Sequence, residues 1–168
     1  KPKYVVAVNM PNTVTARRIP DYLEHLKTLG KAVRKVAILH LEGEFGESFT
    51  AGARESLKEK GYEVVADLSY PVGVTDLTPQ LTKIKSAGAE ALIAVSLPPD
   101  AILLVRTLDQ LGMKPVRIGI GGAYTFPLFR KNTGPLANGW NVVNYWNDDL
   151  RGVKDLANRY KERFKADM

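Results

Sequence analysis

The chain has 168 residues, of which 45% are hydrophobic and 25% charged, a balance typical of a globular protein with a core and not of a disordered segment. It contains no cysteine, which excludes disulfide bonds and cysteine-ligated metal sites. The net charge of +6 does not indicate nucleic acid as a partner, because Lys and Arg alternate with Glu and Asp at helical spacing and form no basic stripe with interleaved aromatics.

Six short runs rich in β-branched residues predict strands, each followed by an amphipathic segment. In chain order these runs are Tyr4–Val8, Lys35–Leu41, Glu63–Leu68, Ala91–Val95, Arg117–Ile120 and Trp140–Tyr145. Strands that alternate with helices predict a parallel sheet covered on both faces. We therefore expect residues 1–168 to form a single α/β domain, a three-layer doubly wound sheet of flavodoxin-like or Rossmann-like order.

Five segments carry apolar side chains at helical spacing, and each of these stripes is expected to face the sheet. The stripes are Ile19, Leu23 and Leu26; Phe49, Ala53 and Leu57; Leu77, Leu81 and Ile84; Ile102, Val105 and Leu108; and Leu156, Tyr160 and Phe164. Pro20 lies inside the first pattern. It either kinks a helix that begins near Thr13 or marks the true first turn of the helix, and we favour the kink.

Ligands of a doubly wound sheet bind beyond the carboxyl ends of the strands, so the loops at that edge are where a site is expected. Those loops are His40–Ser48, Ser69–Asp76, Ser96–Asp100, Gly121–Phe126 and Tyr145–Asp149. They contain the large aromatics Phe45, Tyr70, Tyr124, Phe126, Tyr145 and Trp146. Such rings are typical of the wall of a small-molecule cleft, and the alternative is that some of them pack beneath the loops.

The same loops show no arrangement of residues that indicates catalysis, a metal or a cofactor. Gly119–Tyr124 resembles the start of a dinucleotide-binding fingerprint, but its sixth position is tyrosine and it follows a late strand. The three glutamates of residues 42–47 lack a histidine or serine partner, which favours a solvated cluster near a helix start. Ser48 and Ser96 have no nucleophile-elbow context. We therefore expect no enzymatic activity, no metal site and no cofactor.

The segment Lys35–Ser48, which reads KVAILHLEGEFGES, and the Ala51–Ala53 segment after it resemble the second lobe of Leu/Ile/Val-type periplasmic binding proteins. The similarity continues in the same order through Tyr62–Val65, Tyr70–Pro71, Thr75–Gln80, Pro98–Ala101, Gly121–Tyr124 and Gly139–Trp146. The resemblance implies an extracytoplasmic solute-binding component of an ABC-type importer. Such proteins have two α/β lobes, which are joined at a hinge and close on a small solute before delivering it to a permease.

The resemblance implies that the solute contacts of this lobe fall on Phe45, on Ser96, Leu97 and Pro98, and on Ala123 and Tyr124. Phe45 stands where amino acid binders often have tyrosine, and Leu97 lies in a loop that is often richer in aromatics. Ala123 lies where some members place an acidic group for the ammonium of the solute. These departures put an α-amino acid in doubt and favour a more apolar or aromatic carboxylate.

The resemblance places the hinge at segments Val8–Thr13 and Asn144–Asp149, with Asn9, Met10, Pro11, Tyr145 and Trp146 as hinge residues. It also implies that the first lobe is missing, so that the chain holds half of a cleft and binds a solute weakly or not at all. The apolar rim and sheet edge left uncovered then favour a homodimer. Two alternatives remain: a ligand-sensing domain of a receptor or regulator, and an engineered non-catalytic scaffold derived from this lobe.

Overall fold

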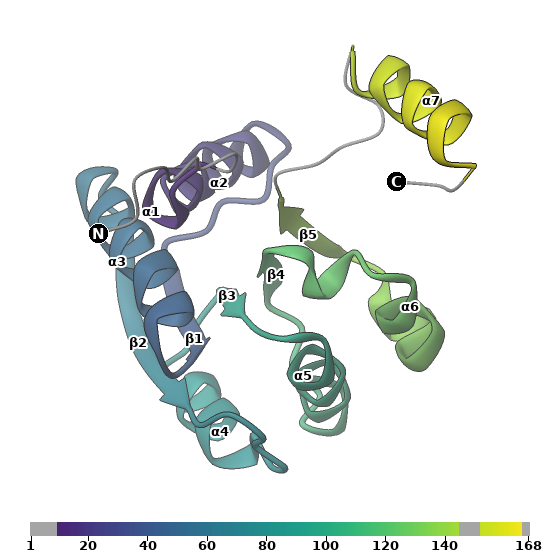
Figure 1. The fold of residues 1–168 in the computed structure, drawn as a ribbon. Helices are drawn as coiled ribbons and strands as arrows, with labels where there is room; N and C mark the ends of the chain where they lie inside the picture. Colours follow the sequence, from purple (N-terminus) through teal and green to yellow (C-terminus); the bar gives the residue numbers. More distant parts are fainter. Residues whose placement is uncertain (1–9, 145–151, 166–168) are drawn as a thin grey trace, which may run out of the picture.

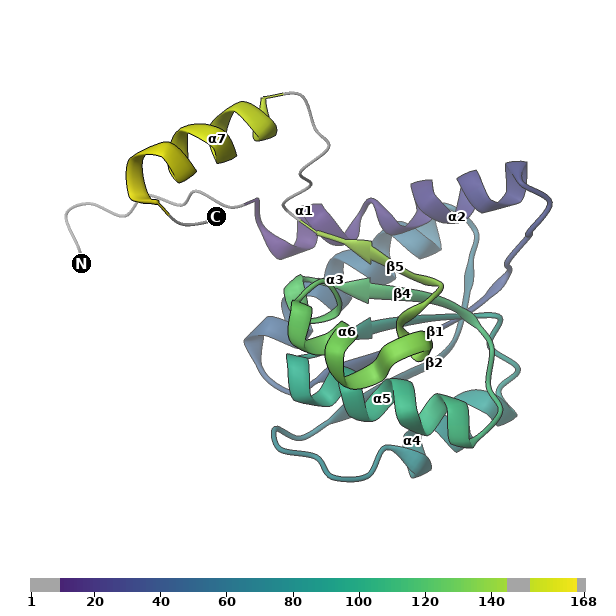
Figure 2. The same ribbon diagram turned by 90° about the vertical axis from the view of Figure 1, so that its right-hand side faces the viewer.

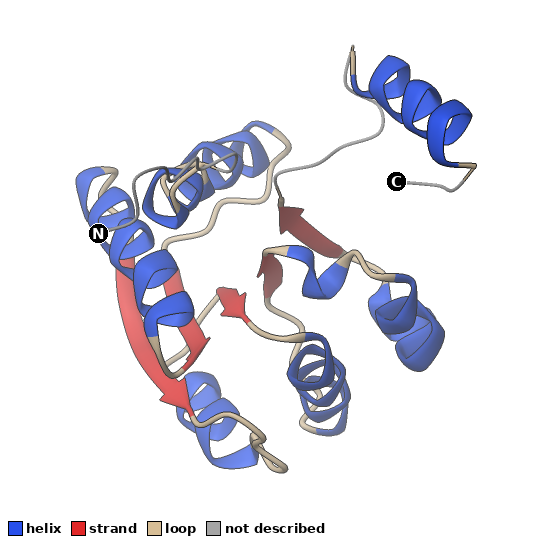
Figure 3. Ribbon diagram, in the orientation of Figure 1, coloured by secondary structure: helices blue, strands red, loops and turns tan. Residues whose placement is uncertain are grey.

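The computed structural model describes residues 10–144 and 152–165. Its five strands are β1 (Lys35–Leu41), β2 (Glu63–Tyr70), β3 (Ala91–Val95), β4 (Val116–Ile120) and β5 (Trp140–Val143). They form one parallel sheet in the order β2-β1-β3-β4-β5 (Figures 1 and 3). This is the flavodoxin-like order, so the predicted fold class is confirmed. The predicted strand Tyr4–Val8 lies outside the described residues.

The predicted strand limits agree best at the centre of the sheet. β1 and β3 begin and end at the predicted residues, because both are apolar runs buried almost throughout and bounded by polar or turn residues. β2 extends two residues further than predicted, to Tyr70, and β4 begins one residue earlier, at Val116. The described part of the last strand ends at Val143.

Helices cover both faces of the sheet (Figure 2). On one face lie α1 (Asn12–Ala16), α2 (Ile19–Thr28) and α3 (Glu44–Glu59), and on the other lie α4 (Thr78–Ser86), α5 (Pro98–Gln110) and α6 (Pro127–Thr133). Two short 3-10 turns, η1 (Gly122–Tyr124) and η2 (Gly134–Ala137), flank α6, and α7 (Val153–Phe164) follows β5. In the part of the chain that the structure describes, no helix combines the length and apolarity needed to cross a membrane.

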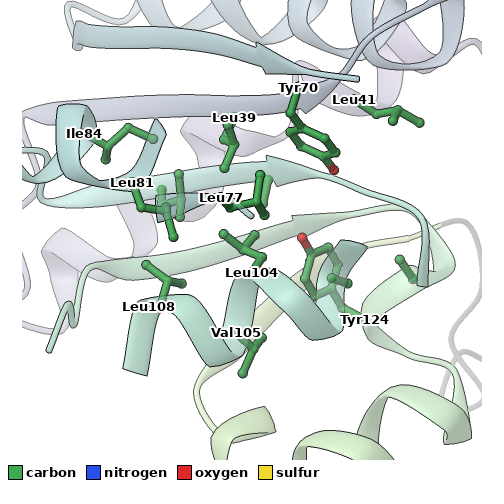
Figure 4. Packing of buried hydrophobic residues seen from close by; sticks show 14 of the residues in the cluster. Leu39, Leu41, Tyr70, Leu77, Leu81, Ile84, Leu104, Val105, Leu108 and Tyr124 are labelled. Atoms are coloured by element: carbon green, nitrogen blue, oxygen red, sulfur yellow. The ribbon is translucent and has the colours of Figure 1, made fainter. Parts of the chain in front are cut away.

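The core consists of two apolar layers, one on each side of the sheet. Successive side chains of β1 alternate between them, so that Ile38 packs in the layer of α2 and α3 while Leu39 packs in the layer of α4 and α5 (Figure 4). The predicted stripes of α2, α3 and α4 are buried throughout. Each fully buried Leu or Ile contributes roughly 1.5–3 kcal/mol relative to an exposed one, so these stripes fix the helices on the sheet.

The first helical pattern forms two helices, so the expected single kinked helix is wrong. α1 ends at Ala16 and α2 begins at Ile19, with Pro20 in its first turn. Pro20 has no N–H to donate to the carbonyl of Ala16, and its ring would clash with that carbonyl, so a continuous helix is disfavoured. α1 packs closely on α3, because Gly52 has no Cβ; a Cβ there would lie 2.3 Å from the carbonyl oxygen of Thr13.

The last predicted stripe does not face the sheet, in contrast to the expectation. Leu156 and Phe164 of α7 are 41% and 57% exposed. α7 lies apart from the sheet (Figures 1 and 2), and Tyr160 packs on Phe164 of the same helix, with ring centroids 4.7 Å apart. An amphipathic period shows that a helix has an apolar face, but it does not show which surface covers that face.

Candidate functional site

Exposed apolar side chains gather at the edge of the sheet where the parallel strands end. Phe45 follows β1, Val72 follows β2, Leu97 follows β3, and Phe126 and Leu128 follow β4. Their exposed fractions are 38%, 72%, 41%, 52% and 54%. Because the strands are parallel, all of these loops lie at one edge (Figure 2). This is the edge at which doubly wound sheets bind ligands, so these side chains mark the candidate site.

A tight turn between β1 and α3 presents Phe45 at this edge. Gly43 has a φ of 103°, a conformation that side chains other than glycine rarely adopt. A Cβ on Gly46 would lie 1.8 Å from the carbonyl oxygen of Leu41, so the first turn of α3 passes directly against the end of β1. The ring of Phe45 meets that of Phe49 edge to face, with centroids 5.4 Å apart. The ring of Phe45 therefore packs on Phe49 on one side and is exposed on the other.

Three buried hydroxyl groups lie directly beneath the apolar edge. The Oγ of Ser96 is 2.9 Å from the hydroxyl oxygens of both Tyr70 and Tyr124, and the hydroxyl of Tyr70 is 3.1 Å from the carbonyl oxygen of Val95. One arrangement gives every proton its own acceptor: Tyr124 donates to Ser96, Ser96 donates to Tyr70, and Tyr70 donates to the Val95 carbonyl. Figure 4 shows the two tyrosine hydroxyls pointing toward one another. This network joins the ends of β2, β3 and β4.

Burial raises the pKa of Tyr70 and of Tyr124 well above the ordinary tyrosine value, although the hydrogen bond with Ser96 partly offsets this in each case. Both tyrosines are therefore neutral at physiological pH. Asp100, in the first turn of α5, also has a raised pKa because it is buried, and the N–H of Leu97, 3.4 Å away, offsets part of that rise.

The side chain of Tyr124 belongs to the core. It is 3% exposed, and its ring stacks on that of Trp140 at 4.3 Å between centroids and meets Phe129 edge to face at 5.3 Å. Gly119 makes room for it, since a Cβ there would lie 2.3 Å from the Tyr124 ring. Ala123 is also buried, at 4% exposed. The loop after β4 therefore turns these two side chains inward and leaves Phe126 outside.

The six predicted solute contacts all lie at this edge, but they divide into two groups. Phe45 and Leu97 are exposed and Pro98 is half-buried, whereas Ser96, Ala123 and Tyr124 are buried. Whether any of them binds a solute stays a prediction. The sequence placed Phe126 among the loop aromatics but not among the contacts, and its exposure singles it out. Only the direction of a loop side chain distinguishes it from Tyr124, and the sequence pattern does not encode that direction.

Three of the five predicted hinge residues lie outside the described residues: Asn9, Tyr145 and Trp146. Met10 and Pro11 are exposed and lead directly into α1. The amide Nδ2 of Asn12 donates to Ser48 Oγ at 2.8 Å, which ties this segment to α3 near the apolar edge.

Two acidic residues near the start of α3, Glu42 and Glu47, contact neighbouring polar groups. Glu47 lies 3.8 Å from Arg54, and Glu42 accepts a hydrogen bond from Ser69 at 3.3 Å. Buried His40 lies near both Glu47 and Asp67, at 3.9 and 3.7 Å. Across residues 10–144 and 152–165, no group of three or more His, Asp or Glu side chains is placed to hold a metal ion.

Comparison with known proteins places this geometry in a family. The chain is 32% identical to the Leu/Ile/Val-binding protein homolog 7 of Brucella abortus (strain 2308) over 92 residues. These 92 residues make up 54% of this chain and 23% of that protein. The fatty acid ABC transporter substrate-binding protein from Thermomonospora curvata superposes with a TM-score of 0.74 at 21% identity, covering 99% of this chain and 43% of that one. An ABC transporter solute-binding protein from R. palustris, solved in complex with benzoate, superposes with a TM-score of 0.77 at 17% identity, covering 95% and 43%.

The chain thus spans less than half the length of each of these proteins. The sequence profile of a family described as periplasmic binding protein matches residues 3–168, which is nearly the whole chain. The profile match, the flavodoxin-like sheet and the apolar carboxyl edge agree, and we conclude that the chain belongs to the periplasmic binding protein family, a family of solute-binding proteins and not of enzymes.

Proposed function

We propose that this chain is one lobe of an extracytoplasmic solute-binding protein that delivers a small solute with an apolar body to an ABC-type permease. The observation that carries the proposal is the division of side chains at the carboxyl edge. Apolar side chains such as Phe45, Leu97 and Phe126 are exposed there, while the hydroxyls of Ser96, Tyr70 and Tyr124 bond to one another beneath them. The names of two similar proteins mention fatty acid and benzoate, which agrees with an apolar or aromatic carboxylate, whereas the Brucella relative is named for Leu, Ile and Val.

In this proposal Phe45, Leu97 and Pro98 contact the apolar body of the solute, and Ser96, Ala123 and Tyr124 hold the loops in place from beneath. The polar end of the solute faces away from this lobe, toward a partner lobe that completes the cleft. Tight sites bury 70–90% or more of a ligand, so half a cleft binds in the millimolar range. Met10 and Pro11, with Asn9, Tyr145 and Trp146, join the two lobes.

Thermal unfolding of the chain in the presence of candidate solutes tests the proposal. Benzoate, octanoate and leucine are added at millimolar concentration, with glucose as a polar control. A solute that binds only the native state raises the melting temperature. We expect a rise with benzoate and octanoate and none with glucose.

Two variants show whether the effect arises at the carboxyl edge. Leu97→Ser alters a side chain that is 41% exposed at this edge, and Leu29→Ser alters one that is 63% exposed at the end of α2, away from it. We expect the solute-induced rise to disappear in Leu97→Ser and to persist in Leu29→Ser. A rise that is the same in both variants, or equal with glucose, would overturn the proposal.

A further inference from the structure

A cavity lies at the edge of the sheet opposite the carboxyl edge, where the strands begin. α5 starts beyond the end of β3 and runs back to this opposite edge, where the chain turns into β4 (Figure 2). The last turns of α5, the residues that lead into β4 and the 3-10 turn η2 enclose a volume of about 390 Å³. Small-molecule sites in proteins span about 300–1,000 Å³, so this space is large enough for a ligand.

Much of the cavity wall is apolar. Val105 and Leu108 of α5 are each 2% exposed, and half-buried Met113 and Leu136 complete the apolar part of the lining. All four pack in the core layer of α4 and α5, so the wall is held in place by the fold. The apolar body of a ligand would leave water on entering this space, which favours binding.

A half-buried arginine borders the apolar wall. Nη2 of Arg117 donates to the carbonyl of Asn138 at 2.8 Å, and its guanidinium carbon lies 5.9 Å from the centroid of the Trp140 ring. Gly139 makes room for this arrangement, since a Cβ there would lie 2.8 Å from Nη2. These contacts fix the direction of the guanidinium, and its other N–H groups can still donate to an anion.

Positive charge prevails around the cavity. Within residues 10–144 and 152–165, neither Arg117 nor Lys114, which also lines the cavity, forms an ion pair with a carboxylate. Nearby, Lys85 donates to the carbonyl of Leu111 at 2.7 Å and so offsets the negative end of α5. The acidic residue of the lining is Asp109, and it is exposed to solvent.

We propose that this cavity binds a small monocarboxylate with an apolar body. Its carboxylate accepts hydrogen bonds from Arg117 and Lys114, and its body packs on Val105, Leu108 and Leu136. A planar guanidinium matches the geometry of a carboxylate, and such charge-assisted hydrogen bonds are roughly twice as strong as neutral ones. The site lies at the opposite edge from the exposed side chains of Phe45 and Leu97, and it does not rest on the proposed function.

Chemical-shift mapping of the 15N-labelled chain at neutral pH tests the proposal, since it detects weak binding and reports its location. Hexanoate is compared with hexylammonium, which has the same chain length and the opposite charge. We expect hexanoate to perturb the amides of Leu108, Gly112, Lys114 and Leu136 in a saturable way at millimolar concentration. Hexylammonium should leave these amides unchanged.

Two matched variants show whether Arg117 holds the carboxylate. Arg117→Gln should weaken hexanoate binding about tenfold, because it removes a charge-assisted hydrogen bond. Arg106→Gln should leave binding unchanged, since Nη2 of Arg106 also donates to a backbone carbonyl, that of Asn132 at 2.9 Å, but Arg106 does not line the cavity.

A third variant covers the case in which Arg117→Gln does not fold, as judged by the loss of a cooperative thermal transition. Lys114→Gln alters an exposed side chain and should weaken hexanoate binding about threefold.

Three results would overturn the proposal: equal binding of hexanoate and hexylammonium, equal weakening by Arg117→Gln and Arg106→Gln, and no perturbation of the cavity amides. If hexanoate perturbs only the amides of Phe45 and Leu97, the cavity proposal is wrong and the proposed function stands. If benzoate and octanoate fail at the carboxyl edge while hexanoate saturates the cavity, the reverse holds.

Discussion

Ser96 joins three strand ends through its side-chain oxygen, so a single substitution there should lower the stability of the whole fold. Ser96→Ala leaves the hydroxyl of Tyr124 without its acceptor in a site that water does not reach. We expect the free energy of unfolding to fall by about 1–3 kcal/mol, as measured by urea denaturation. Ser69→Ala, which removes an exposed hydroxyl bonded to Glu42, should change it by less than about 0.5 kcal/mol. Equal effects of the two substitutions would mean that the buried network does not stabilise the fold.

Glu90 shows how an exposed carboxylate can support the start of the sheet. The backbone N–H groups of Arg34 and Lys35 donate to it at 2.6 and 3.0 Å, and these bonds lower its pKa below the ordinary value of 4.5. A lowered folded-state pKa stabilises the fold above pH 4.5 and ceases to do so as the pH falls through the folded-state value. Glu90→Gln should therefore reduce stability by less than about 1 kcal/mol at neutral pH, with the difference from the parent vanishing in acid.

Urea denaturation at neutral pH and well below pH 4.5 measures this dependence. A difference for Glu90→Gln that persists unchanged in acid would contradict the role of its charge.

At the scale of helices and strands, the sequence predicted the buried strands and the buried helix stripes, but it did not predict features that depend on which neighbours a residue packs against. β1 and β3 were predicted to the residue, because a strand buried on both faces is apolar throughout. The stripes of α2, α3 and α4 were predicted because the side of each helix that packs on the sheet is apolar. At Pro20 the sequence left two alternatives open; the kinked helix that we favoured is wrong, and the alternative is correct, since Pro20 lies in the first turn of α2. At the site, Phe45 and Tyr124 look alike in sequence, and only packing against Gly119 and Trp140 turns Tyr124 inward.

The contact between α1 and α3 offers a test at this scale. A Gly→Ala change inside a helix ordinarily stabilises a protein by about 0.5–1 kcal/mol. At Gly52 the new Cβ would meet the backbone of Thr13 at 2.3 Å, so we expect the opposite sign and a loss of about 1–3 kcal/mol. Ala51→Gly, at the adjacent exposed position, should cost only about 1 kcal/mol through helix propensity. A Gly52→Ala variant more stable than the parent in thermal unfolding would show that α1 does not pack on α3 in this way.

At the scale of the whole molecule, α7 is the described helix whose apolar stripe lies apart from the core. Replacing exposed Leu156 and Phe164 together by Gln should change the free energy of unfolding by less than about 0.5 kcal/mol, as judged by urea denaturation. A loss of several kcal/mol would mean that the stripe is buried in solution, for example against a second copy. Light scattering would then reveal the predicted homodimer, and the same double substitution should abolish it.

The strand order also determines how readily each part of the sheet opens. β1 is hydrogen-bonded on both sides, to β2 and β3, and its side chains are almost completely buried, whereas β5 is bonded to β4 along one side. Backbone amides of β1 and β3 should therefore exchange with deuterium only when the whole protein unfolds, and those of β5 should exchange through local opening. Phe45 and Leu97 thus follow β1 and β3, the strands whose amides we expect to exchange most slowly. The loops that carry Phe45 and Leu97 would therefore keep their shape while β5 opens locally.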